Sequence, residues 1–217
     1  MAAKAKVKIC GLTDPAAAEW AAEAGASFLG VVFFPPSPRA VTLSRAAEIF
    51  EFVPAKIARV ALFVDPSDSQ LEQAMNQVRL DYLQLHGRES PERVEQIRLE
   101  FGMPVIKALG IGGAADLEAA KTYDSIADML LFDAKPAPGA DRPGGHGQAF
   151  DWSLLQGRKW SSRWFLAGGL TPDNVAQAIS QSGAKLVDVS SGVEKAPGVK
   201  DPDKVARFIN AAKGPSS

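Results

Sequence analysis

Eight short apolar segments recur along this 217-residue chain, and they constrain its fold more than any other feature. Each is almost continuously apolar, which is typical of strands that are covered on both faces. Alanine-rich or charged amphipathic stretches separate them. We therefore expect eight strands, at Lys6–Cys10, Phe28–Phe33, Lys56–Val64, Asp81–Leu85, Pro104–Ala108, Met129–Phe132, Trp164–Ala167 and Leu186–Val189.

The stretches between these strands carry helix signals. A capping residue followed by proline predicts a helix start, because the side chain accepts a bond from a free amide and proline suits the first helical position. Four such pairs occur: Asp14-Pro15, Ser90-Pro91, Thr171-Pro172 and Asp201-Pro202. Three glycines fall where helices should end: Gly25, Gly102 and Gly183.

Strand and helix alternate about eight times without a break in composition, which predicts a parallel α/β architecture. For this length we expect a single (β/α)8 TIM barrel, with eight parallel strands and outer helices, over residues 1–217. A flavodoxin-like sheet of about five or six strands would leave two apolar runs unexplained. No GxGxxG or P-loop follows the first strand. The one long loop, 133–150, is rich in proline and glycine and is expected to be functional.

Composition excludes several classes of partner. The net charge of −1, from 24 basic and 25 acidic residues, gives no broad attraction for nucleic acid or an anionic membrane. One cysteine, Cys10, and two histidines, His86 and His146, make a Cys/His zinc site unexpected. No apolar run is long enough to span a bilayer, and the N-terminus lacks a secretory signal, so we expect a cytoplasmic protein.

Two candidate acid/base residues lie at strand ends, where barrels of this type place their active sites. Cys10 ends the first strand beside Gly11, and Asp133 follows the sixth. Burial against apolar residues favours the neutral form of a carboxyl group, which suits a general acid. The alternatives are a small buried side chain for Cys10 and a helix cap or solvated loop residue for Asp133.

Glycine-containing segments after the seventh and eighth strands predict a phosphate site. Gly168 and Gly169 allow the backbone to approach an anion closely, and a short extra helix from Ser191 through Gly192 would point amides at it. The alternative is that these are ordinary turn glycines.

Four further polar residues lie near the same mouth. Arg39, in a loop with three prolines, offers a planar fork for a carboxylate, or is a solvated surface arginine. Gln84 and His86 end the fourth strand, where His86 is expected to line the pocket or to have a structural role. Lys107, in the fifth strand, either adds positive charge to the site or satisfies a neighbouring group.

Several motifs resemble the phosphoribosylanthranilate isomerase family, and the resemblance covers nearly the whole chain. They are Lys8-Ile9-Cys10-Gly11, Gln84-Leu85-His86-Gly87, Gly144-Gly145-His146-Gly147-Gln148-Ala149-Phe150-Asp151-Trp152, Ala167-Gly168-Gly169-Leu170 and Val187-Asp188-Val189-Ser190-Ser191-Gly192-Val193-Glu194. His146 departs from the family pattern, in which a small polar residue is usual.

The resemblance implies an Amadori rearrangement of N-(5-phosphoribosyl)anthranilate, a phosphorylated sugar, without a cofactor or metal. It implies Cys10 as general base and Asp133 as general acid, with Arg39 on the anthranilate carboxylate and Asp188 lining the same pocket. Two alternatives are a histidine-pathway isomerase, which should have an aspartate in place of Cys10, and a non-enzymatic phosphate-binding barrel. We expect a monomer or a homodimer.

Overall fold

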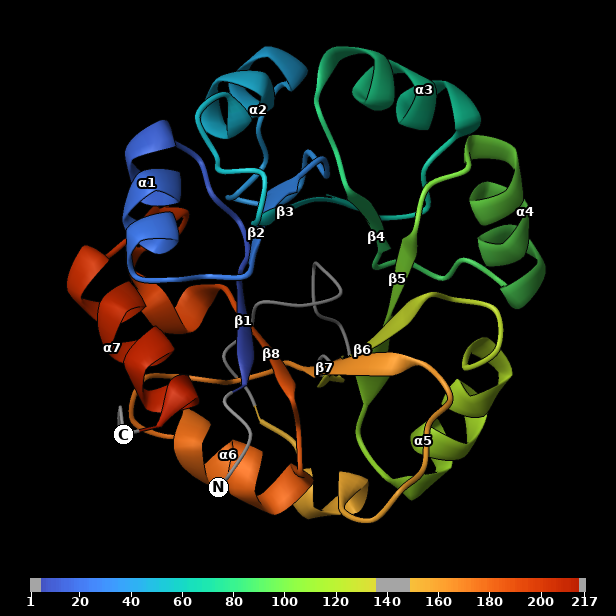
Figure 1. Ribbon diagram of the computed structural model, residues 1–217. Coiled ribbons are helices and arrows are strands. Elements are labelled where there is room, and N and C mark those ends of the chain that lie inside the picture. Colours follow the sequence, from blue (N-terminus) through green and yellow to red (C-terminus); the bar gives the residue numbers. More distant parts are fainter. Residues whose placement is uncertain (1–4, 136–148, 215–217) are drawn as a thin grey trace.

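Eight parallel strands close into a barrel in this computed structural model, which describes residues 5–135 and 149–214. They follow one another around the barrel in sequence order, and β1 pairs with β8 to close it (Figure 1). The strands are β1 Lys6–Ile9, β2 Phe28–Val32, β3 Ala58–Phe63, β4 Tyr82–Leu85, β5 Val105–Ile111, β6 Met129–Ala134, β7 Arg163–Leu166 and β8 Leu186–Val189. The predicted barrel is confirmed, and the flavodoxin-like alternative is wrong.

Seven α-helices in the described residues surround the barrel. They are α1 Pro15–Glu23, α2 Leu43–Phe50, α3 Asp68–Gln77, α4 Pro91–Phe101, α5 Ala114–Ala120, α6 Val175–Ser182 and α7 Pro202–Lys213. Shorter elements are the 3-10 helices η1 Lys121–Tyr123, η2 Trp152–Leu155 and η3 Ser191–Val193, and an antiparallel pair of strands, β9 Glu194–Ala196 and β10 Val199–Lys200. Between β6 and β7 the described part of the chain contains only η2 in the place of an α-helix.

Three of the four predicted cap and proline pairs begin helices. Asp14, Ser90 and Asp201 each accept a hydrogen bond from the amide three residues later, at the starts of α1, α4 and α7. The prediction for Thr171-Pro172 is wrong, because α6 begins at Val175. The Thr171 amide donates to Asn174 Oδ1 at 2.7 Å, so these residues form a turn before the helix.

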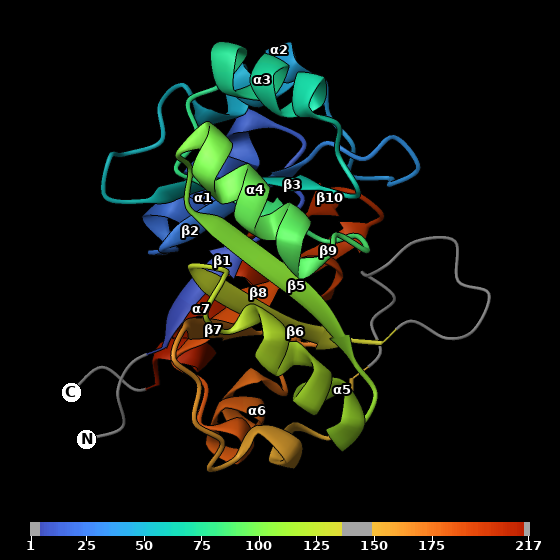
Figure 2. The same cartoon turned by 90° about the vertical axis from the view of Figure 1, so that its right-hand side faces the viewer.

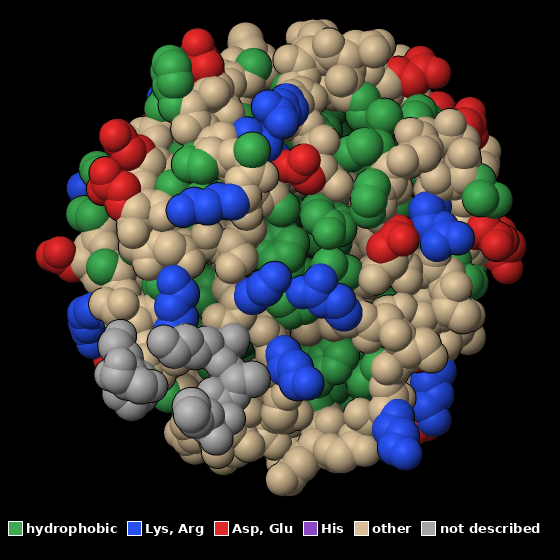
Figure 3. Space-filling view, in the orientation of Figure 1, with side chains coloured by type: hydrophobic (Ala, Val, Ile, Leu, Met, Phe, Trp, Pro, Cys, Tyr) green, Lys and Arg blue, Asp and Glu red, His purple; other side chains and the backbone are tan. Residues whose placement is uncertain are grey.

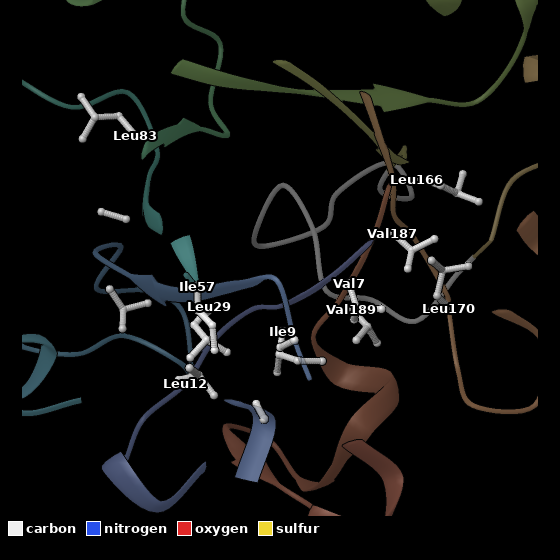
Figure 4. Close-up of a cluster of buried hydrophobic side chains, with 14 of the residues drawn as sticks. Val7, Ile9, Leu12, Leu29, Ile57, Leu83, Leu166, Leu170, Val187 and Val189 are labelled. Carbon is white, nitrogen blue, oxygen red and sulfur yellow. The ribbon is translucent and has the colours of Figure 1, made fainter. Parts of the chain in front are cut away.

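The alternation of side chains along each strand separates two apolar layers. Outward residues pack against the helices, and Figure 4 shows part of this layer, including Val7 and Ile9 of β1. Inward residues fill the barrel: Phe28, Val60, Ile106, Ala108, Met129, Leu131, Phe165, Ala167 and Leu186. Because Val7 and Ile9 point outward, Lys8 and Cys10 point into the barrel.

The loops that follow the strands gather at one end of the barrel. In the side view of Figure 2, the β9–β10 hairpin lies at the end toward which β5 points. This is the end at which the predicted site residues lie, because they occupy the carboxyl ends of the strands.

Candidate active site

Cys10 lies directly after β1 and is buried inside the barrel beside an ion pair. Lys8 Nζ donates to Asp188 Oδ1 at 2.9 Å, and the two residues are register partners on β1 and β8. A Cβ atom on Gly30 of β2 would lie 3.2 Å from Cys10 Sγ and 3.3 Å from Lys8 Nζ. The missing side chain of Gly30 therefore leaves room for both groups.

Burial and charge act in opposite directions on Cys10. Burial raises the pKa of the thiol above its ordinary value, and the Lys8 ammonium offsets only part of this increase. Burial alone would lower the pKa of Lys8, but Asp188 and Cys10 outweigh it and raise that pKa. The shift in the Lys8 pKa favours its charged form beside the thiol.

Asp133, near the end of β6, lies opposite the end of β4. Its Oδ1 accepts a hydrogen bond from the Ala134 amide at 2.8 Å, and its Oδ2 lies 3.4 Å from His86 Nε2. On the other side of the imidazole, Gln84 Nε2 lies 3.2 Å from His86 Nδ1. When the amide donates to Nδ1, the ring carries its proton on Nε2, facing the Asp133 carboxylate.

Arg39 is buried in an ion-pair network that sequence reasoning missed. Its guanidinium binds Glu194 through two bonds, Nε to Oε1 at 2.7 Å and Nη2 to Oε2 at 2.8 Å. Lys200 Nζ also donates to Glu194 Oε1 at 2.8 Å and to the Ser190 carbonyl at 3.0 Å. Nη1 of Arg39 has no acceptor among the described residues, so that edge can bind a ligand.

Lys107 belongs to the outer layer and not to the barrel interior. Its ammonium donates to Glu89 Oε2 at 2.6 Å and to the Gly87 carbonyl at 2.9 Å, and it lies 5.8 Å from the centre of the Tyr123 ring. Of the two predictions for Lys107, the structure therefore supports the satisfaction of a neighbouring group.

The loops after β7 and β8 contact each other at Gly192. A Cβ on Gly192 would lie 1.9 Å from the Leu170 carbonyl oxygen. Gly168 and Gly169 have positive φ angles of 83° and 63°, which favour glycine. A short helix does begin at Ser191, as predicted. The amides of Gly168, Gly169, Ser191 and Gly192 donate no hydrogen bond to any other described residue.

The loop containing Gly144-Gly145-His146-Gly147 lies outside the described residues. Within residues 5–135 and 149–214, no group of three His, Cys, Asp or Glu side chains is placed to hold a metal ion. In the same ranges, no helix combines the length and the apolar character needed to cross a bilayer.

Comparison with known proteins gives consistent matches along the chain. Residues 7–211 match the family model of N-(5'phosphoribosyl)anthranilate isomerase. An N-(5'-phosphoribosyl)anthranilate isomerase of Paramagnetospirillum magneticum is 61% identical over 209 residues, which covers 96% of this chain and 97% of that protein. The corresponding isomerase of Rhodospirillum rubrum is 58% identical over 211 residues, covering 95% and 97%.

Solved structures show the same similarity. Phosphoribosyl anthranilate isomerase from Thermotoga maritima superposes with a TM-score of 0.87 at 38% identity, covering 96% of this chain and 98% of that one. A second structure, with a TM-score of 0.84 at 36% identity and the same coverage, is a phosphoribosyl anthranilate isomerase in complex with reduced 1-(o-carboxyphenylamino)-1-deoxyribulose 5-phosphate.

Proposed function

This chain belongs to the N-(5'-phosphoribosyl)anthranilate isomerase family and catalyses that isomerisation in tryptophan biosynthesis, and we propose that Cys10 is the general base and Asp133 the general acid. One observation carries this proposal. The two side chains point into the same end of the barrel, Cys10 from just after β1 and Asp133 from β6, and both residues are buried. An acid and a base at one mouth can act on opposite sides of a bound sugar.

The rearrangement to 1-(2-carboxyphenylamino)-1-deoxyribulose 5-phosphate needs only proton transfers. Asp133 would protonate the ring oxygen, which opens the furanose and leaves a Schiff base. Cys10 would then remove the proton from C2′, giving an enolamine that tautomerises to the ketone. The acid and base have separate environments, because Lys8 and Asp188 flank Cys10 while His86 flanks Asp133.

Gln84 and His86 line the pocket beside the proposed acid. His86 Nε2 lies within 3.4 Å of Asp133 Oδ2, and Gln84 holds the other ring nitrogen. We propose that these successive contacts, from Gln84 through His86 to Asp133, orient the carboxyl group of Asp133 toward the substrate. Gln84 Oε1 is buried without a hydrogen-bond partner in the described residues and can accept a bond from a sugar hydroxyl.

The charged ends of the substrate would be held by different loops. We propose that the free edge of Arg39 binds the anthranilate carboxylate and that Asp188 lines this part of the pocket. The amides of Gly168, Gly169, Ser191 and Gly192 would bind the phosphate. Binding both ends fixes the ribose between Cys10 and Asp133.

A turnover assay tests the activity on which this assignment of roles depends. Purified protein is incubated with freshly generated phosphoribosylanthranilate, and the loss of its anthranilate-type fluorescence is followed. A phosphate-binding barrel without catalytic function would bind the substrate and leave the fluorescence unchanged. A histidine-pathway isomerase would act on its own, larger bis-phosphate substrate and not on this one.

The oligomeric state, the domain boundaries and the location in the cell stay predictions. We propose one domain over residues 1–217, in the cytoplasm, as a monomer or a homodimer. A Thermotoga maritima relative is described as dimeric. On this chain Phe52, which follows α2, is 85% exposed, so an apolar side chain is available for a subunit contact. Sedimentation of the wild type and of Phe52→Glu distinguishes the two states.

A further inference from the structure

Lys8 is fully buried and paired with Asp188. The ion pair by itself does not explain why a positive charge is placed inside the barrel. Burying an ion pair costs desolvation free energy that a well-packed apolar pair would not. Inward side chains of other strands, such as Phe28, Val60 and Ile106, are apolar, so the barrel interior can be filled without charge. The position of Lys8 relative to the proposed base supplies a chemical reason.

Lys8 and Cys10 point the same way because they are two residues apart on one strand. A single point at Gly30, where a Cβ would stand, lies 3.3 Å from Lys8 Nζ and 3.2 Å from Cys10 Sγ. The ammonium and the thiol therefore lie close to the same point inside the barrel, beside Gly30. Asp188 holds the ammonium from the opposite side at 2.9 Å.

The other groups around Cys10 stabilise a thiolate less than Lys8 does. From β2 and β3 the neighbours are Val32 and Leu62, which are apolar. From β8 comes Asp188, whose negative charge disfavours a thiolate. Lys200 of β10 also favours the thiolate, but its effect on Cys10 is smaller than that of Lys8. Lys8 is therefore the main stabilising charge for a thiolate at this site.

We propose that Lys8 is a positioning residue for the isomerisation: its ammonium, anchored by Asp188, stabilises the thiolate of Cys10 so that the sulfur can accept the C2′ proton. The inference rests on the proposed role of Cys10 as the base. In the step itself, the C2′–H bond breaks, its proton passes to Sγ, and its electron pair moves into the Schiff base to give the enolamine. Lys8 keeps its protons throughout.

The thiolate can be titrated directly, because Cys10 is the only cysteine in the chain. Its ultraviolet absorbance is recorded against pH, with Cys10→Ser as the blank. Replacing Lys8 by methionine removes the charge and keeps the length of the side chain. In Lys8→Met we expect the titration to move up by about 1 to 3 pH units, the usual effect of losing a close opposite charge. Lys8→Arg should restore most of the shift.

The kinetic readout should follow the titration. In Lys8→Met the acidic limb of the kcat/KM profile should move up by the same interval, with about a tenfold loss of kcat/KM at neutral pH for each unit. If Lys8→Met does not fold, the variant Lys8→Met/Asp188→Asn removes both buried charges. Its thiol should titrate above the wild type and below the single variant, because Lys8 acts on Cys10 more strongly than Asp188 does.

Lys107→Met is the matched control. Lys107 is also almost fully buried and paired with a carboxylate, but it faces the helix layer. Its replacement should leave the thiol titration unchanged. A Lys8→Met titration equal to the wild type, or equal shifts in the Lys107 and Lys8 variants, would overturn the proposal. If the titration moves but Cys10→Ala turns over normally, the electrostatic inference holds and the assignment of Cys10 as base fails.

Discussion

Arg39 and Glu194 form a two-point ion pair, with Nε 2.7 Å from Oε1 and Nη2 2.8 Å from Oε2. Glu194 thereby holds the guanidinium in one orientation, with its Nη1 edge available to a ligand. A planar, pre-oriented fork suits a carboxylate better than a mobile ammonium does. The pair therefore links the hairpin β9–β10 to the proposed anthranilate pocket.

Arg39→Ala should mainly raise KM. The carboxylate it would bind is remote from the bonds that change, so the interaction contributes similarly to the ground state and the transition state. The variant should also be destabilised by about 1 to 3 kcal/mol, because Glu194 loses two of its hydrogen bonds. Steady-state kinetics and urea unfolding measure the two effects. An unchanged KM would show that the carboxylate binds elsewhere.

Glu194 should also make stability depend on pH in the acid range. Burial raises its pKa, but hydrogen bonds from Arg39 and Lys200 outweigh burial and hold the pKa below the ordinary value of 4.5. A depressed folded-state pKa stabilises the native state above the unfolded-state value, and this is lost as the pH falls through the folded-state value. The difference in unfolding free energy between wild type and Glu194→Gln should therefore shrink below about pH 4.5. A constant difference across this range would contradict the prediction.

The fold could be predicted because strands buried on both faces leave continuous apolar runs in the sequence. Strand ends were less predictable. The sequence predicts a fifth strand that ends at Ala108, but the strand continues to Ile111, because pairing with β6 reaches Ile111 and Ala134. Tertiary pairing, which no local pattern encodes, extended it.

The site could be predicted only in part. The positions of Cys10 and Asp133 could be predicted, because a barrel of this type brings the carboxyl ends of its strands together. The Arg39–Glu194 pair spans 155 positions and depends on where the β9–β10 hairpin folds, so nothing local indicates it. The position of Lys8 beside Cys10 could also have been predicted, because a lysine two residues before Cys10 on a strand points to the same face of that strand.

Removing the thiol should remove catalysis. Cys10→Ala should lower kcat at least about a hundredfold, the usual scale for a lost general base, while circular dichroism shows an intact fold. Alkylation of wild-type protein should abolish turnover, and a substrate analogue should protect against it. Near-normal kcat in folded Cys10→Ala would assign this residue to packing alone.

Asp133→Asn should separate binding from chemistry. Asparagine retains an oxygen that can accept the Ala134 amide, so the fold and ligand affinity should be preserved. It cannot donate the acidic proton, so kcat should fall at least about a hundredfold. Calorimetric binding of a product analogue is measured beside the turnover rate. A rise in KM with an unchanged kcat would mean that the carboxylate only positions substrate.

A basic pocket at the opposite end of the barrel is an alternative position for the phosphate. Figure 3 shows Lys and Arg side chains gathered over the centre of this face. Lys6, Arg163 and Lys185 line a pocket of about 380 Å³ at the beginnings of β1, β7 and β8. These side chains form no ion pair with any described residue. Any test of the phosphate site must therefore distinguish the two ends.

Gly192→Ala tests the phosphate site at the carboxyl end of the barrel. The new Cβ would lie 1.9 Å from the Leu170 carbonyl oxygen, so the two loops must separate and their amides can no longer converge on one anion. We expect KM to rise at least about tenfold, because the phosphate helps hold the sugar in line with Cys10 and Asp133.

Gly113→Ala is the control, since a Cβ there meets no atom within 4 Å. A substrate without its phosphate should bind both glycine variants and the wild type equally poorly. If Lys185→Gln raises KM and Gly192→Ala does not, the phosphate binds at the basic face instead.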